Sequence, residues 1–118
     1  NKTNCGRPCD DHIVQLRDRV GAEHPLHADV GCRNTLYNAV PQSAAELVSV
    51  LRQQGVRHFR IELLEDSGEA ARMAVRTYAE LLSGELSGQE VWQRLQATNR
   101  VGVTRGTMEA GKDPLAIL

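Results

Sequence analysis

The chain has 118 residues, which is enough for one domain with its own core. Hydrophobic residues make up 41% and charged residues 25%, so the sequence is too apolar for an intrinsically disordered protein. Its 14 basic and 15 acidic residues leave a formal charge of −1, which excludes the strongly basic surface of a dedicated nucleic-acid binder. No apolar run approaches the ~20 residues of a membrane span and no signal peptide begins the sequence, so we expect a cytoplasmic protein without membrane contact.

The first 40 residues differ in character from the rest of the chain. Residues 1–40 hold all three cysteines and three of the four histidines, and they lack helical periodicity. Partial alternation over residues 12–17 predicts a strand, while residues 26–30 and 35–37 are shorter extended candidates. We therefore expect a small β-rich layer that needs more than hydrophobic burial to hold it together.

Regular secondary structure is expected in residues 41–101. The first helix is predicted over residues 43–54, because its apolar residues recur on one face. Ser43 and Glu46 have the spacing of a capping box at its start. Gly55 supplies the left-handed residue that commonly ends a helix.

A strand and two more helices follow. Residues 56–64 alternate between charged and apolar side chains, which is typical of a strand. A helix is expected over residues 67–83, and Ser87 with Glu90 forms a second capping box that begins a shorter helix. Residues 102–118 form a loop-like tail. The order helix, strand, helix predicts an α/β fold, as a fragment of an alternating βα domain that carries the cysteine-bearing β-rich layer at its N-terminal side.

Clustered cysteines are the strongest candidates for chemistry. Three is an odd number, which a disulfide framework does not favour, and thiols in a reducing compartment more often indicate metal or redox chemistry. An iron–sulfur cluster normally takes four thiolates and would need a cysteine from outside this chain, whereas zinc accepts mixed cysteine and histidine ligands. The alternative is three free thiols. The candidate metal ligands are Cys5, Cys9, Cys32, His12, His24 and His27.

Three charged residues are candidates for one wall of a functional site. Arg60 and Glu62 share one face of the expected strand, near the end where α/β folds place their chemistry. They form either an inward-facing ion pair or a solvated strand face. Arg105 lies in a glycine-containing segment that could cradle an anion, although an ordinary exposed loop also explains it. The segment lacks the lysine of a P-loop, and no Gly-x-Ser-x-Gly nucleophile motif occurs.

Four segments in the same order resemble the C-terminal part of bacterial peptidase family U-32, the collagenase-like peptidases. The resemblance covers nearly the whole chain, from Cys5 to Thr107. Leu63 and Leu64 stand where the family more often has Gly-Arg. The four segments are Asp29–Thr35, Gln42–Glu46, Gly55–Glu62 and Gly102–Thr107.

This resemblance implies a barrel-like α/β catalytic region, of which the chain would hold the last βα units. Some family members are assigned as metal-dependent peptidases, and others use an iron–sulfur cluster to hydroxylate RNA bases or a quinone precursor. The implied partners are the remainder of the full-length chain and a protein, peptide or RNA substrate, and the 118 residues alone are expected to be inactive. The alternative is a zinc-clipped structural or accessory binding module without catalytic activity.

Overall fold

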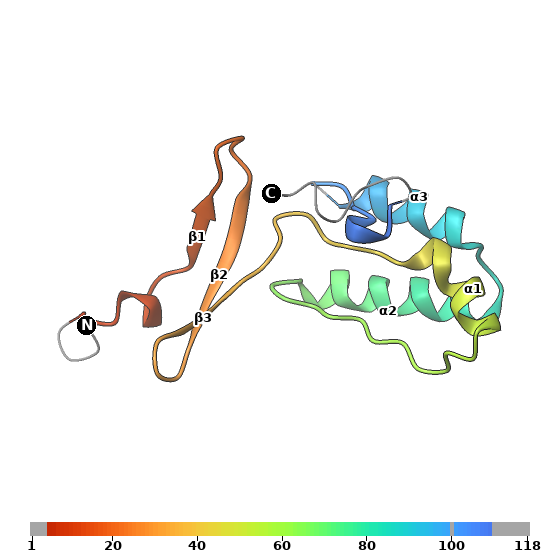
Figure 1. Cartoon of the computed structure of the whole chain (residues 1–118), viewed down its shortest axis with the longest axis horizontal. Helices are drawn as coiled ribbons and strands as arrows, with labels where there is room; N and C mark the ends of the chain where they lie inside the picture. Colours follow the sequence, from red (N-terminus) through yellow and green to blue (C-terminus); the bar gives the residue numbers. More distant parts are fainter. Residues whose placement is uncertain (1–4, 100, 110–118) are drawn as a thin grey trace. The chain divides into compact units, whose positions relative to one another are not determined.

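The computed structural model describes residues 5–99 and 101–109. The chain divides into two compact units after Pro41. We call residues 5–41 the sheet unit and residues 42–109 the helical unit. The described residues form a three-stranded antiparallel sheet and three α-helices, so the chain is mixed α/β (Figure 1). No helix within these residues has the length and apolar character needed to cross a membrane.

The sheet unit is an antiparallel meander with the middle strand paired on both sides (Figure 1). Leu26 of the middle strand lies opposite Val14 on one side and Leu36 on the other. The predictions of a strand near 12–17 and of two extended segments near 26–30 and 35–37 are confirmed, with shifted ends. The strands are β1 (Val14–Arg17), β2 (Glu23–Asp29) and β3 (Arg33–Leu36), preceded by the short 3-10 helix η1 (Pro8–Asp10).

Backbone hydrogen bonds and turns hold the sheet unit, because none of its described residues is buried. At the turn between β1 and β2, Asp18 accepts hydrogen bonds from the backbone N–H groups of Val20 and Ala22, both at 2.9 Å. At the turn between β2 and β3, Cys32 adopts a left-handed backbone with φ of 63°. The unit thus depends on contacts other than hydrophobic burial, as the sequence predicts.

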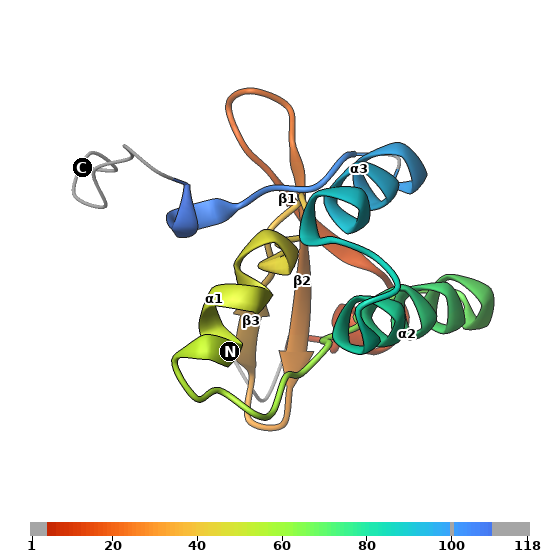
Figure 2. The same cartoon turned by 90° about the vertical axis from the view of Figure 1, so that its right-hand side faces the viewer.

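The helical unit has one small hydrophobic core. Helices α2 (Gly68–Ser83) and α3 (Gly88–Thr98) run in opposite directions, and α3 also packs on the 3-10 helix η2 (Ala45–Leu47) (Figures 1 and 2). The core residues are Ala45, Val48, Leu81 and Val91, against which Tyr78, Leu86 and Leu95 pack. The elements of the unit are η2 (Ala45–Leu47), α1 (Val48–Gln53), α2 (Gly68–Ser83), α3 (Gly88–Thr98) and η3 (Gly106–Met108).

Most of the predicted helix ends are present in the structure. Ser67 caps α2 by accepting the backbone N–H of Ala70 at 3.2 Å. Ser87 and Glu90 form the complete capping box predicted for the third helix. Gly55 and Gly84 have the left-handed φ values of 97° and 86° that follow a helix C-terminus.

The first predicted capping box is wrong. The segment begins as the 3-10 helix η2, and its N-cap residue, Ala44, makes no side-chain cap. Ser43 is buried and hydrogen-bonds the hydroxyl of Tyr78 at 2.6 Å, while Glu46 pairs with Arg105. Ser43 keeps one local hydrogen bond, from the backbone N–H of Ala45 at 3.2 Å, but both side chains of the predicted box also bind groups distant in the sequence.

The strand predicted at residues 56–64 is not formed. This segment has no regular secondary structure, is exposed and lies between α1 and α2. The described residues of the helical unit contain no other strand with which it could form a ladder. Residues 102–109 are loop-like, as predicted, apart from the short helix η3. A parallel bridge between Gln42 and Thr104 and the buried side chain of Val103 join this loop to the rest of the helical unit. Residues 110–118 lie outside the described part of the chain.

Candidate functional site

The sheet unit contains a pocket of about 260 Å³ that brings together three of the predicted ligand residues. Cys9 reaches it from η1, His12 from the segment before β1, and His27 from β2. Asn34 of β3 adds an amide to the lining, which the sequence did not indicate. The pocket therefore combines a thiol, two imidazoles and an amide with an apolar wall that includes Val14.

Backbone contacts fix the orientation of His12. The Nδ1 atom of His12 lies 3.0 Å from the carbonyl oxygen of Pro8. A carbonyl oxygen can only accept a hydrogen bond, so Nδ1 carries the proton and Nε2 of the neutral ring carries a lone pair. An imidazole held in this way through its other nitrogen is the usual arrangement for a metal-ligating or basic histidine.

The ring of His27 packs against Tyr37 in an edge-to-face contact, with the ring centroids 5.3 Å apart. The strand pairing explains this placement, because β2 and β3 are neighbours and Tyr37 directly follows β3. The backbone N–H of Tyr37 also donates to the carbonyl of Pro25 at 2.8 Å, which extends the pairing beyond the strand. The aromatic contact thus orients a second imidazole at the pocket.

His24 has a different role from the other two histidines. Its Nδ1 accepts the backbone N–H of Ala39 at 3.1 Å, so its Nε2 carries the proton and donates to Asp18 at 3.1 Å. This hydrogen bond, together with those from the backbone N–H groups of Ala22 and Val20, lowers the pKa of Asp18. Because both ring nitrogens are engaged, His24 joins the turn to the end of the sheet unit and offers no lone pair for a metal.

The three cysteines do not gather around one point in this structure. All three are exposed and free, and only Cys9 lines the pocket. The sulfur of Cys5 accepts the backbone N–H of Arg7 at 3.4 Å, while Cys32 occupies the turn between β2 and β3. Among residues 5–99 and 101–109, no three histidine, cysteine or acidic side chains lie close enough to ligate one ion. The predicted convergence of all three sulfurs is therefore absent.

Arg60 and Glu62, in the segment predicted as a strand, form an ion pair at 2.7 Å. Their side chains are 83% and 74% exposed, so the pair belongs to a solvated face. The interpretation of this pair as an inward-facing site wall is not supported here.

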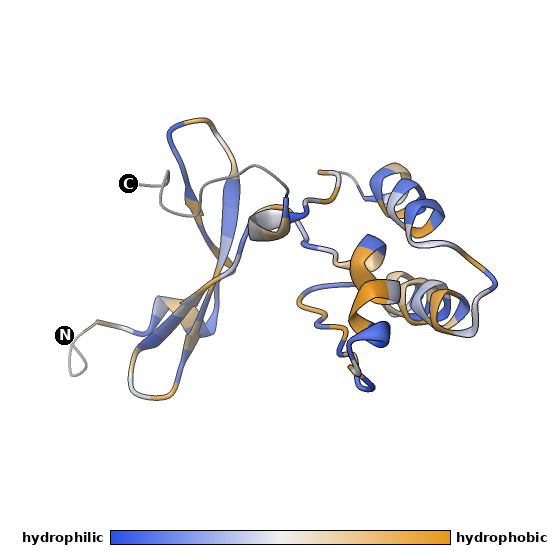
Figure 3. Cartoon of the chain, turned by 45° about the vertical axis from the view of Figure 1, so that its right-hand side comes forward, coloured by the Kyte–Doolittle hydropathy of each residue, from blue (hydrophilic) through white to orange (hydrophobic). Residues whose placement is uncertain are grey.

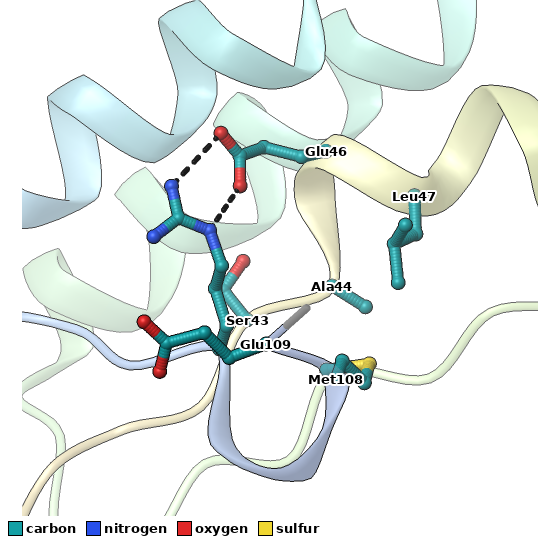
Figure 4. A pocket seen from close by; sticks show the side chains of 7 residues that line it. Ser43, Ala44, Glu46, Leu47, Met108 and Glu109 are labelled. Carbon is teal, nitrogen blue, oxygen red and sulfur yellow. Dashed lines mark hydrogen bonds and ion pairs between the residues drawn. The ribbon is translucent and has the colours of Figure 1, made fainter. Parts of the chain in front are cut away.

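Arg105 is part of a second pocket, of about 340 Å³, in the helical unit. Its guanidinium donates two hydrogen bonds to the carboxylate of Glu46, at 2.6 and 3.1 Å (Figure 4). It also lies 4.0 Å from the ring centre of Trp92. Glu109 also lines this pocket. Because Glu46 already neutralises the guanidinium, the structure favours the ordinary loop over an anion cradle at Arg105.

This ion pair changes the titration of both partners. The hydrogen bonds raise the pKa of Arg105, and they lower the pKa of Glu46 below its ordinary value of 4.5. A carboxyl whose pKa is lower in the folded state stabilises the fold above its unfolded pKa, and that contribution is lost as the pH falls through the folded pKa. The ion pair therefore stabilises the helical unit at neutral pH, and this stabilisation is lost in acid when Glu46 is protonated.

We expect Glu46→Gln to lower the urea midpoint of the helical unit at neutral pH and to weaken its decline on acidification. Fluorescence of Trp92, the single tryptophan, measures this from neutral pH to about pH 3. Glu85→Gln, at an exposed position after α2, is the matched control and should retain the wild-type profile. Equal acid profiles for Glu46→Gln and the wild type would contradict the assignment.

Sequence reasoning missed the long-range partners in the helical unit. Glu46 and Arg105 are 59 residues apart and Ser43 and Tyr78 are 35 apart, and no local pattern pairs them. No family model, curated protein sequence or solved structure matches this chain. Inferences about its function therefore depend on the residues described above.

Proposed function

We propose that this chain is the C-terminal region of a peptidase U-32-like protein and that its sheet unit binds a metal ion. The sequence support is the resemblance of four ordered segments to that family. The structural support is the pocket that Cys9, His12 and His27 all line, with His12 anchored through Nδ1 so that Nε2 is available. This shared pocket is the observation on which the proposal depends.

The donor set favours zinc. One thiolate and two imidazoles are typical zinc ligands, whereas a cluster takes four thiolates and this pocket contains one thiol. Zinc held by three protein ligands keeps a fourth position for water, and bound zinc supplies a hydroxide nucleophile near neutral pH. Ligation would require the three side chains to move closer together, and the exposure of Cys9 leaves room for this movement.

An iron–sulfur cluster is the second candidate. Cys5, Cys9 and Cys32 are all free and exposed, so they could ligate a cluster completed by a thiolate from the remainder of a longer chain if the three sulfurs moved together. In that case the barrel-like region implied by the resemblance would lie partly outside these 118 residues. A zinc-clipped accessory module would instead bind its metal with ligands from these 118 residues alone.

Metal analysis under anaerobic, reducing conditions tests these proposals. We expect the purified chain to bind a single zinc ion, or cobalt as a spectroscopic substitute, and to lose it in Cys9→Ser and His12→Gln. Cys32→Ser and His58→Gln are controls outside the pocket and should retain it. Iron with inorganic sulfide, lost in Cys5→Ser, Cys9→Ser and Cys32→Ser alike, would favour the cluster. No metal in any preparation would contradict both.

A further inference from the structure

The side chain of His24 connects two parts of the sheet unit through its two ring nitrogens. Its Nδ1 accepts the backbone N–H of Ala39 at 3.1 Å, and its Nε2 donates to the carboxylate of Asp18 at 3.1 Å. Asp18 lies at the turn between β1 and β2, whereas Ala39 follows β3 and lies just before Pro41, the last residue of the unit. One imidazole therefore joins the turn to the segment that leaves the sheet.

Single hydrogen bonds matter in this unit because it has no buried core. None of its described residues is buried, and hydrophilic and hydrophobic residues are interspersed along its strands (Figure 3). Parts of a protein with few buried apolar contacts open locally at a low cost in free energy. Within the segment 38–41, the N–H of Val40 turns to the side chain of Asn38, whereas the N–H of Ala39 reaches back to His24 on β2. The bond to His24 thus attaches this segment to the sheet.

This attachment requires a neutral imidazole. A neutral histidine ring has one N–H and one lone pair, whereas the protonated ring has an N–H at both nitrogens. Protonation of His24 would therefore set two donors, Nδ1–H and the N–H of Ala39, against each other. At the other nitrogen the bond to Asp18 would persist and become charge-assisted. A proton thus breaks the contact on one side of the ring and strengthens the contact on the other.

The surroundings of His24 permit this change. Hydrogen bonds from His24 and from backbone N–H groups lower the pKa of Asp18, so this carboxylate stays ionised in the range where histidines titrate. Leu16, opposite His24 on β1, is uncharged. The exposed ion pair of Arg17 with Glu23 lies on the other face of the sheet, because neighbouring residues of a strand point to opposite faces.

We propose that His24 is a proton-sensitive latch, which holds the segment 38–41 against the sheet at neutral pH and releases it in mild acid while the turn at Asp18 stays bound. Histidine changes its charge between about pH 5 and 8. The side chain of His24 is 24% exposed, so protons reach it from solvent. Release of the segment would lengthen the free connection between the two units. The latch is independent of the proposed metal site, because His24 does not line that pocket.

Nuclear magnetic resonance of the 118-residue chain between pH 8 and pH 5 tests the latch. The backbone amide signal of Ala39 should move towards the position of an amide without a hydrogen bond, with the same midpoint as the ring signals of His24. In His24→Asn the amide oxygen can still accept the N–H of Ala39 but does not titrate, so this movement should disappear. His58→Gln removes a histidine of the other unit and should leave the movement unchanged.

The reciprocal variant provides a second measurement. Ala39→Pro removes the N–H that opposes protonation, so the midpoint of the His24 ring signals should rise by about half a pH unit or more, the equivalent of one net hydrogen bond. Asn38→Ala removes only the contact with Val40 and should leave the midpoint in place. An Ala39 amide that stays still while His24 titrates, or an unchanged midpoint in Ala39→Pro, would overturn the proposal.

Discussion

Replacing Gly88 with alanine should destabilise the helical unit by about 2 kcal/mol. Gly88 is the first residue of α3, where it approaches η2 closely. A Cβ atom at this position would lie 2.5 Å from the carbonyl oxygen of Ala45 and 2.7 Å from the Cα of Glu46. These are backbone atoms, so η2 or α3 must shift, and that shift would disturb the core around Ala45 and Val91.

Gly68 supplies a matched control for this substitution. It is the first residue of α2 and also follows a serine cap, but a Cβ atom there would meet no other part of the chain within 4 Å. Gly68→Ala should therefore be neutral or stabilise the unit by about 0.5 kcal/mol through helix propensity. Urea unfolding followed by Trp92 fluorescence compares the two variants. Similar midpoints for both would show that α3 does not approach η2 in this way.

Ser43→Ala should cost about 1–2 kcal/mol, because it removes a buried hydrogen bond and leaves the Tyr78 hydroxyl without this partner. The two oxygens lie 2.6 Å apart, and Ser43 is 5% exposed. Ser43 also accepts the backbone N–H of Ala45 at 3.2 Å, so its loss affects the start of η2 as well. The sequence predicts a cost at the same residue through helix capping, whereas the structure assigns it to a tertiary contact.

A double-mutant cycle separates these two explanations. If the contact with Tyr78 dominates, Tyr78→Phe should lower the unfolding free energy by a similar amount, and the double variant should cost less than the sum of the two. Ser49→Ala, at an exposed position on α1, should be nearly neutral. Additive costs for the two single variants would instead support a purely local capping role for Ser43.

The sequence predicted the residue types of the proposed metal site. It did not predict which of the candidate cysteines and histidines line the same pocket. Cys9, His12 and His27 could be named from sequence because cysteine and histidine are the common ligands of zinc. Their shared pocket depends on η1 lying against the meander, which no local pattern specifies. His24 looks equivalent in sequence, yet its two ring nitrogens are used by Ala39 and Asp18.

Local sequence determined α2 and α3 and most of the helix ends. The caps of α2 and α3 and the left-handed stops at Gly55 and Gly84 involve residues within one turn of each other, so nearby side chains are sufficient to specify them. The alternation over 56–64, by contrast, did not produce a strand. A strand also needs a partner, and no alternation in one segment can supply the second set of hydrogen bonds.

Only the tertiary structure decided which groups meet. Glu46 has the correct spacing for a capping box, but Arg105 takes its carboxylate with two hydrogen bonds and stacks on Trp92. A charged bidentate pair is stronger than a single cap to a backbone N–H, so it prevails once folding brings the two residues together. The hydrogen bond between Ser43 and Tyr78 also depends on the tertiary structure. A buried hydroxyl without a hydrogen-bond partner costs free energy, and the packing of the helices determines that Tyr78 is the partner of Ser43.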